Sequence, residues 1–177
     1  NLTGTFTIPI VDNDLVEDEK KFRVNLSNIQ TNNANLFFID AQATVTINDD
    51  DQAGIAIDDI TVNESDGTAT LTVSLDKPVE SDVSVYYSTA DLNAVQSEDY
   101  QSRSGTIIFS AGQQTKTISI PIVASSQVEL DETFLVHLSN IQAGILDVVF
   151  TDDQGEVTIH DEAQAALSID DITVDED

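Results

Sequence analysis

Ala69-Thr-Leu-Thr-Val-Ser-Leu75 is the stretch that decides the fold. Apolar and polar residues alternate strictly along it, so every second side chain lies on the same face of an extended chain. The residues on the apolar face are Ala69, Leu71, Val73 and Leu75. A period of two built from β-branched residues predicts a strand with one buried face. The stretch therefore predicts one wall of a hydrophobic core.

The same alternation continues on both sides of this stretch. Further strands are expected at residues 55–62, 83–89, 105–109, 114–123, 134–138 and 156–159. Asp66-Gly67 and Ala111-Gly112 predict tight turns between strands, and no stretch of the sequence sustains a helical period. Seven short antiparallel strands at this spacing predict an all-β fold, a seven-stranded immunoglobulin-like sandwich of two sheets.

The chain also repeats itself after 112 residues. Phe22–Gln30 returns as Phe134–Gln142, Val45–Ile47 returns as Val157–Ile159, and Ile57–Val62 returns as Ile169–Val174. A period of this length is a whole domain rather than one unit of a solenoid. In this register residues 53–164 form a complete repeat, residues 1–52 match the second half of a repeat, and residues 165–177 match its first strand. We interpret the chain as a segment of a longer tandem array.

Charge limits the classes of partner. The chain has 33 acidic and 6 basic residues, a net charge of −27, and no Cys. Neither nucleic acid nor an anionic membrane surface is an expected partner, because phosphate binding needs clustered Lys and Arg, and no apolar run suits direct membrane insertion. The 40% hydrophobic content and the ordered alternation argue against disorder. Calcium would offset the repulsion between acids and replace disulfides as a cross-link. An acidic surface of the halophilic type is the alternative, and the two can coexist.

The acidic residues cluster at one point of each repeat. In the first unit they lie in the loop Asp12-Asn-Asp14-Leu-Val-Glu17-Asp-Glu19 and in the linker Asp49-Asp50-Asp51. Calcium takes about six to eight oxygen ligands, mainly from carboxylates and carbonyls. Loops at one end of a sandwich can bring such ligands together, whereas acids spread along strands cannot. An EF-hand is excluded, because the loop lacks the Gly and the Glu that the EF-hand needs at its sixth and twelfth positions.

An ordered set of motifs in the complete repeat resembles the Calx-beta domain. The set consists of Glu98-Asp99-Tyr100, Gly105–Phe109, Phe134–Asn140 and Val157–Asp161. The family includes regulatory domains of sodium–calcium exchangers and many repeats in bacterial surface proteins. The resemblance covers the complete repeat, the half repeat before it and the strand after it. It implies a seven-stranded sandwich that binds calcium through loops at one end, near the junction with the next domain.

The resemblance also implies ligands, which differ between the two units. In the first unit they are Asp12, Glu17, Asp49, Asp50 and Asp51, with Asn13 at a position where the family can have Asp, and Asp14 completes the candidate set. Lys20 stands where the family can have a ligand Glu, which lowers the expected number of ions. In the complete repeat the implied ligands are Glu64, Asp99, Glu129, Glu132, Asp161 and Glu162. There Ala124-Ser-Ser126 replaces the acidic triplet and Ala163 replaces Asp51, so we predict fewer ions or weaker binding.

The sequence lacks the residues that a zinc site or a catalytic site would need. The two His residues, His137 and His160, have no Cys beside them to complete a zinc site. Neither His has a nucleophile placed to act with it. The carboxylate pairs lie at a domain end rather than in a cleft suited to glycoside hydrolysis. The sequence therefore predicts no enzymatic activity.

These observations favour a calcium-binding structural segment of a large extracellular or cell-surface adhesin or matrix fibre, in which calcium rigidifies the junctions between domains. The alternatives are a regulatory calcium-sensing domain pair and a passive spacer beside an enzyme or lectin. The expected partners are neighbouring repeats of the same chain. Self-assembly, with a half repeat completed by another copy, is a further alternative, although residues 1–52 and 165–177 together leave positions 66–112 without a counterpart.

Overall fold

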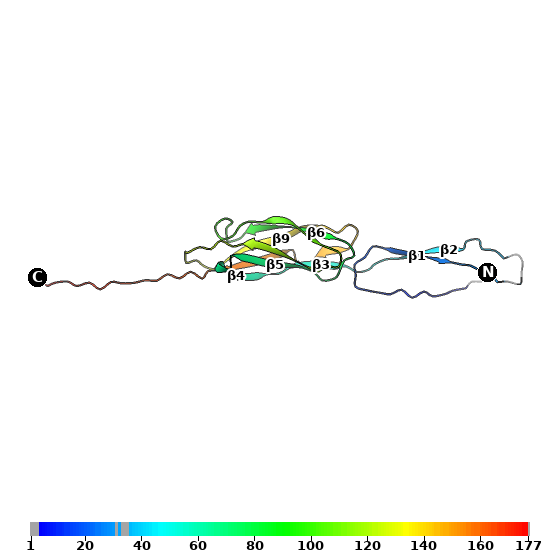
Figure 1. Ribbon diagram of the computed structural model, residues 1–177, viewed down its shortest axis with the longest axis horizontal. Coiled ribbons are helices and arrows are strands. Elements are labelled where there is room, and N and C mark those ends of the chain that lie inside the picture. The colour runs from blue at the N-terminus through cyan, green and yellow to red at the C-terminus, as the bar shows by residue number, and fades with distance from the viewer. Residues whose placement is uncertain (1–3, 31, 33–35, 177) are drawn as a thin grey trace.

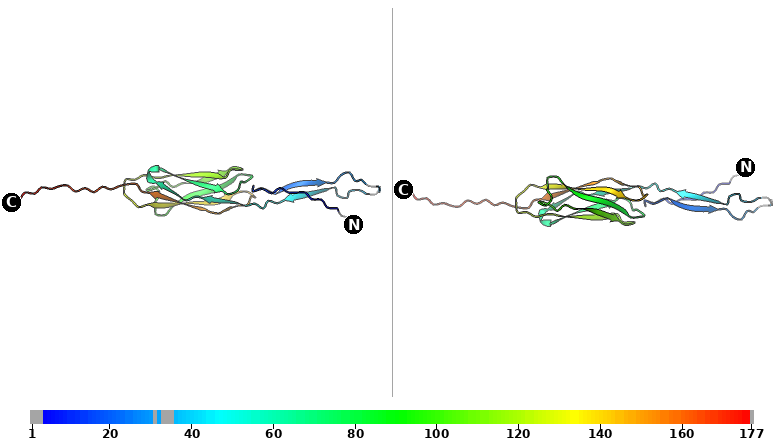
Figure 2. Two further views of the ribbon diagram at one scale, coloured as in Figure 1. Left: turned by 90° about the horizontal axis from the view of Figure 1, so that it is seen from below. Right: turned by 90° about the horizontal axis from the view of Figure 1, so that it is seen from above.

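The computed structural model describes residues 4–30, 32 and 36–176. We call residues 53–164 the complete unit, residues 1–52 the half-unit and residues 165–177 the tail. Figure 1 shows the complete unit at the centre, with the half-unit on one side and the tail extending from the other, and the views in Figure 2 agree. No helix among the described residues has the length and the apolar composition to span a bilayer.

Among the described residues of the half-unit two strands form a hairpin, and nine strands form the complete unit, all of whose residues are described. The half-unit strands are β1 (Lys20–Asn25) and β2 (Gln42–Ile47). Those of the complete unit are β3 (Ala53–Ile57), β4 (Ile60–Asn63), β5 (Thr68–Leu75), β6 (Val83–Asp91), β7 (Ser104–Phe109), β8 (Thr115–Pro121), β9 (Glu132–Gln142), β10 (Val148–Phe150) and β11 (Gln154–His160). A 3-10 turn, Glu64–Asp66, joins β4 to β5.

The complete unit is a sandwich of two sheets, which confirms the predicted fold class. One sheet has the order β10-β3-β5-β8 and the other the order β4-β11-β9-β6-β7. Most neighbouring strands are antiparallel, but β10 pairs with β3 and β11 pairs with β4 in parallel. The strand count is therefore nine rather than the seven expected, and the pairing is not wholly antiparallel.

The stretch 55–62, expected as one strand, divides between the two sheets at Asp58-Asp59. The Asp58 Oδ1 atom accepts a hydrogen bond of 2.6 Å from the Thr72 backbone N–H in one sheet. The Asp59 Oδ1 atom accepts one of 2.7 Å from the Glu156 backbone N–H in the other sheet. Two adjacent carboxylates thus bond to opposite sheets, and the chain crosses the edge of the sandwich between them. The remaining extra strand, β10, is three residues long.

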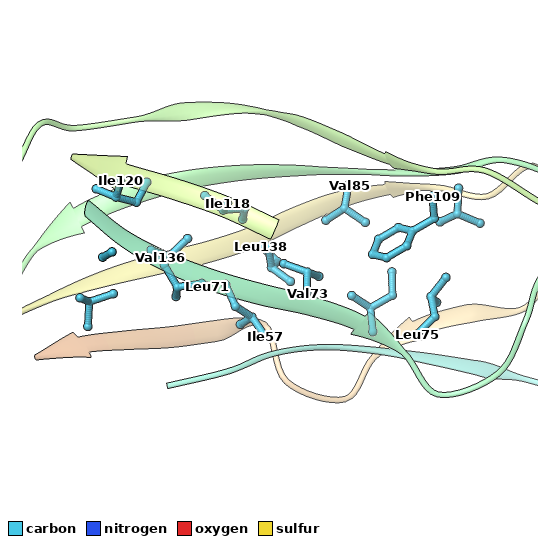
Figure 3. Close-up of a cluster of buried hydrophobic side chains, with 14 of the residues drawn as sticks. Ile57, Leu71, Val73, Leu75, Val85, Phe109, Ile118, Ile120, Val136 and Leu138 are labelled. Atoms are coloured by element: carbon cyan, nitrogen blue, oxygen red, sulfur yellow. The ribbon is translucent and has the colours of Figure 1, made fainter. Parts of the chain in front are cut away.

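The core lies between the inner faces of the two sheets. Figure 3 shows Ile57, Leu71, Val73 and Leu75 of one sheet facing Val85, Phe109, Val136 and Leu138 of the other. The alternation that predicted β5 is borne out, because Ala69, Leu71, Val73 and Leu75 are all buried. Fully burying one side chain of this size contributes about 1.5–3 kcal/mol. The core therefore fixes the complete unit as a rigid support for the loops at its ends.

The hairpin of the half-unit keeps the register of its counterpart in the complete unit. All six pairs between β1 and β2, from Lys20 with Ile47 to Asn25 with Gln42, return 112 residues later between β9 and β11. In both copies a Phe faces a Val: Phe22 faces Val45, and Phe134 faces Val157. The repeat seen in the sequence is therefore also a repeat of strand pairing.

Candidate metal sites

The two acidic segments of the half-unit meet at the junction with the complete unit. They enclose a pocket of about 190 Å³ between the loop that precedes β1 and the linker that follows β2. The polar residues that line the pocket are Asp12, Asn13, Glu17, Asp18, Lys20, Asn48, Asp49, Asp50 and Asp51. We call this the junction site.

Hydrogen bonds hold the loop of the junction site against the linker. The backbone N–H of Glu17 donates to Asp49 Oδ2 over 2.9 Å. Within the loop, Asn13 Oδ1 accepts from the Leu15 N–H over 2.7 Å, which forms a local turn. The first bond places the backbone of Glu17 next to the Asp49 carboxylate, although 32 residues separate them in the chain.

The same loop docks onto the complete unit through Val16. This side chain is fully buried, and Val16 forms an isolated parallel bridge with Val79. The Val16 N–H donates to the Pro78 carbonyl and the Glu80 N–H donates to the Val16 carbonyl, each over 3.0 Å. The junction site therefore lies where two units meet, and its loop is anchored to both.

Two lysines bring positive charge to the junction site. Lys77 of the complete unit lies 2.6 Å from Asp51 Oδ1, and this hydrogen bond is the main reason why the pKa of Lys77 is raised. Lys20 bonds to Glu80 across the junction, which likewise raises the pKa of Lys20 and lowers that of Glu80. No motif in the sequence indicates the role of Lys77, because its contact with Asp51 depends on how the two units meet.

Five carboxylates converge at the far end of the complete unit, around a void of about 10 Å³. They belong to Glu64, Asp99, Glu129, Glu132 and Asp161, and Leu130 and Ile159 complete the lining. We call this the distal site. It is formed by the 3-10 turn, the loop before Tyr100, the loop before β9 and the end of β11.

Buried neighbours position two of the distal carboxylates. Tyr100 is buried and stacks on Phe134 with ring centroids 4.0 Å apart. The stack fixes the backbone of the adjacent Asp99, whose Oδ2 atom accepts from the Val95 N–H over 2.7 Å. Glu64 is 9% exposed, and its Oε1 atom accepts from the Ser125 N–H over 2.6 Å. This hydrogen bond links the 3-10 turn after β4 to the loop that contains Ser125.

The distal carboxylates differ in their affinity for protons. Burial, followed by a hydrogen bond with Asp99, raises the pKa of Glu132 to about 7. The pKa of Asp161 is lowered, because the backbone N–H groups of Glu129 and Ala163 donate to it over 2.8 and 2.9 Å. Glu132 therefore holds a proton more readily than a free carboxyl group does, and Asp161 less readily. The crowding of these carboxylates favours binding of a cation.

One hydrogen bond of the junction site recurs at the equivalent position of the distal site. The bond from the Glu17 N–H to Asp49 in one site returns as the bond from the Glu129 N–H to Asp161 in the other. Both bonds obey the 112-residue offset. The repeat therefore reproduces the framework that joins loop and linker, even where the acids on that framework differ.

Two of the candidate ligands lie outside the pockets. Asp14 does not line the junction site and instead lies close enough to Lys77 to raise the pKa of that lysine. Glu162 does not line the distal site, because its carboxylate accepts a hydrogen bond from the Ser65 hydroxyl. The other eleven candidates line one of the two pockets.

The donors in both pockets fit calcium by their chemistry. They are carboxylate and amide oxygens, whereas zinc prefers His and Cys, and neither His137 nor His160 lines either pocket. Among the described residues, no group of three or more His, Asp or Glu side chains is arranged closely enough to hold a metal ion as it stands. Binding would therefore require carboxylates to turn inward from their present hydrogen bonds.

Comparison with known proteins gives one family. The Calx-beta domain matches residues 1–51 and, in tandem, residues 52–163. The chain is 32% identical over 136 residues to the sodium/calcium exchanger Calx of Drosophila melanogaster. It is 30% identical over 155 residues to sodium/calcium exchanger 3 of Rattus norvegicus. Each match covers 75% of this chain but only 14% and 17% of the two exchangers.

Solved structures give the same fold. The apo-form Calx CBD1 domain superposes with a TM-score of 0.58 at 24% identity, which covers 63% of this chain and 99% of that domain. The calcium binding domain CBD12 of CALX1.1 superposes with a TM-score of 0.59 at 24% identity, which covers 63% of this chain and 47% of that structure. At this level of identity the likeness supports the fold alone.

Proposed function

Because the chain belongs to the Calx-beta family, we propose that it is a calcium-binding tandem repeat in which bound calcium rigidifies the junction between neighbouring units. The proposed division is a half-unit over residues 1–52, a complete unit over residues 53–164 and the first strand of a further unit over residues 165–177. The solved relative CBD12 of CALX1.1 is itself described as a calcium binding domain.

The observation that carries this proposal is the position of the junction site. Its loop is anchored on the complete unit through Val16 and Val79, and its linker continues directly into β3. Any ligand that draws the loop and the linker together therefore also restrains the angle between the units. A bound calcium ion would offset the repulsion between the carboxylates of the site.

The protein groups of the junction site have separate roles in this proposal. Asp49 holds the backbone of Glu17 through the bond between loop and linker, and the side chains of both residues line the pocket, with Asp12 and Asp50 adding carboxylates from the two segments. Asp51 is shared with Lys77 of the complete unit, so its carboxylate links the site to the neighbouring unit before any ion binds. Extracellular modules bind calcium with Kd values of about 10⁻⁴–10⁻³ M, the range we expect here.

The wider role that we propose is structural. An acidic, Cys-free tandem repeat with stiffened junctions suits the stalk of an extracellular or cell-surface adhesin, or a matrix fibre. We propose no enzymatic activity for these units.

A second candidate function is a regulatory calcium-sensing domain pair. It is favoured by the relatives, which are sodium/calcium exchangers, and by a junction that two units share. The two functions predict different affinities for calcium, since sensors bind it with Kd values of about 10⁻⁷–10⁻⁵ M. A passive spacer, the third reading, would bind no calcium.

Calorimetric titration of the chain with calcium, together with limited proteolysis in calcium and in EDTA, tests the proposal. We expect binding, a higher melting temperature in calcium because only the folded state binds, and faster cleavage at residues 49–53 in EDTA. If EDTA changes neither the melting temperature nor the cleavage, the calcium proposal is wrong. Saturation at micromolar calcium would favour the sensor over the structural role.

A further inference from the structure

The loop between β6 and β7 carries Asp99 into the distal site, and its first residues make four hydrogen bonds to one residue of β9. Asn93 Oδ1 accepts from both the backbone N–H and the hydroxyl of Thr133, each over 2.7 Å. The Thr133 carbonyl accepts in turn from the N–H groups of Asn93 and Ala94, over 3.1 and 2.8 Å. We call these four bonds the clamp. The clamp fixes the start of the loop on β9.

The clamp begins where the pairing of β6 with β9 ends. The last pair of that ladder is Asp91 with Phe134, so Thr133 lies one residue beyond it. There the chain leaves β6 as a loop, and the Asn93 side chain supplies an acceptor to Thr133 where no strand remains to do so. Ala94 is fully buried beside it. The clamp thus extends the contact between β6 and β9 toward the distal site.

The rest of the loop is closed on itself. Asp91 Oδ1 accepts from the Tyr100 hydroxyl over 2.6 Å, which joins the first residue of the loop to its last. Between them, the Val95 carbonyl accepts from the N–H groups of Glu98 and Asp99, over 3.2 and 3.0 Å. The Val95 N–H donates to the Asp99 carboxylate. Asp99 is therefore held by bonds within the loop, and its position follows that of the loop as a whole.

The clamp links two carboxylates of the distal site. Glu132 immediately precedes Thr133, Asp99 belongs to the clamped loop, and both acids line the same void. Asn93 does not line the void, and its amide oxygen is turned to Thr133. We propose that Asn93 is a positioning residue for calcium at the distal site, because through the clamp it sets the distance between the carboxylates of Asp99 and Glu132. This inference rests on the calcium binding proposed above.

The physical reason for a clamp at this place is the repulsion between the carboxylates. Calcium takes its oxygen ligands at about 2.3–2.6 Å, so the ligands must converge on one point. Neighbouring carboxylates repel each other when no cation lies between them, and this repulsion would drive the loop away from β9. The clamp opposes that movement with bonds that involve no carboxylate of the site. The ligands are therefore brought together on folding rather than on binding.

Terbium luminescence gives a readout that is specific to the distal site. The three Tyr residues of the chain, Tyr86, Tyr87 and Tyr100, all lie in the complete unit, and Tyr100 is adjacent to Asp99. Terbium binds to carboxylate oxygens as calcium does, and it luminesces when a neighbouring Tyr is excited. Titration of the full chain with terbium, followed by competition with calcium, therefore measures the calcium affinity of the distal site separately from that of the junction site.

Three variants of the clamp are expected to form a series. Asn93→Leu removes the acceptor of both Thr133 donors, and the calcium affinity of the distal site should fall by about tenfold, the loss typical of partners that orient metal ligands. Thr133→Val removes the hydroxyl but keeps the N–H bond, so its loss should be smaller. Asn93→Asp keeps an acceptor in the same place and should retain the affinity of the natural chain.

A matched control makes the same change of amide to Leu away from the distal site. Gln114 Nε2 donates to the carbonyls of Leu75 and Asp76, over 3.2 and 3.3 Å. These residues lie at the end of β5 that is remote from the 3-10 turn and the distal site. Gln114→Leu should therefore leave the terbium and calcium affinities of the distal site unchanged, even where it lowers the melting temperature in EDTA.

Each outcome decides the proposal. Unchanged affinity in Asn93→Leu would overturn it, as would a loss of the same size in Asn93→Asp. A loss of affinity that follows the loss of melting temperature across all four variants would assign the effect to stability and would also overturn it. If the natural chain binds neither terbium nor calcium at the distal site, the proposed function fails there and this inference fails with it. That result is distinguishable, because it appears before any substitution is made.

Discussion

Phe22 in the half-unit and Phe134 in the complete unit occupy the same position in two copies of one hairpin. Both face a Val across the strand pair in the same register, but Phe134 is fully buried while Phe22 remains partly exposed. The difference comes from the partners outside the hairpin, since Phe134 stacks on Tyr100 and lies among the strands of a full sandwich. Local sequence therefore suffices for the register, whereas burial needs the rest of the unit.

The two acidic sites also share a local framework and differ in what surrounds it. Each has the same bond from a loop N–H to a linker carboxylate, but a neighbouring unit contributes Lys77 to the junction site, while the distal site uses Glu64 from its own unit. One site is thus sensitive to the angle between units and the other to the fold of one unit.

Removing the aromatic ring from each hairpin should expose the difference in packing. Phe134→Ala is expected to lower the free energy of unfolding of the complete unit by about 3–5 kcal/mol, because it leaves a cavity beside Tyr100. Phe22→Ala serves as the matched variant and should leave the urea midpoint of the complete unit unchanged. A comparable loss in both variants would mean that the half-unit and the complete unit unfold as one cooperative structure.

The fold was largely predictable because its main signal is local. The alternation at residues 69–75 gave the strand, the buried face and the class of fold, as the burial of Leu71 and Val73 confirms. The division of residues 55–62 was not predictable from alternation, because β3 pairs with β5 and β10 in one sheet while β4 pairs in the other sheet with β11, about a hundred residues later. At three residues, β10 itself is too short to show a period.

The sites were predictable in their location but not in their geometry. Acidic clustering pointed to the right loops, and most of the candidates line the two pockets. Asp161 and Glu162 show the limit, since adjacent residues of an extended chain point in opposite directions and Glu162 turns to Ser65. The contact of Lys77 with Asp51 depends on how two units meet, which no motif encodes.

Removing the linker carboxylate of one site should weaken calcium binding at that site and leave the other site unchanged. Asp49→Ala removes both a proposed ligand and the acceptor of the Glu17 N–H, so calcium affinity at the junction site should fall by at least about tenfold. Asp161→Ala should do the same at the distal site alone. Calorimetric titration of the two variants checks this. If either substitution abolishes binding at both sites, the sites are not independent.

Removing the lysine that crosses the junction should have a smaller effect of opposite sign. Lys77→Gln frees the Asp51 carboxylate from its ion pair, so calcium affinity at the junction site should rise by up to about fivefold, the range set by exposed ion pairs. The distal site should not change. Lys116→Gln, on β8 of the same unit, controls for the change in net charge. An equal rise in both variants would assign the effect to long-range charge rather than to the contact with Asp51.

The smallest effect concerns the pH dependence of the distal site in calcium-free buffer. Glu132 faces the carboxyl groups of Glu64, Asp99, Glu129 and Asp161, and its pKa in the folded protein is about 7, above the ordinary value of 4.5. The folded state therefore retains a proton that the unfolded chain has already lost. The resulting stabilisation is complete below the ordinary pKa and disappears as the pH rises through the folded value. Melting temperatures in EDTA should accordingly fall between about pH 5 and about pH 8. Glu132→Gln carries no charge at any pH and keeps both His residues, so the difference between the two curves isolates Glu132. Parallel curves for the variant and the natural chain would contradict a raised pKa at this position.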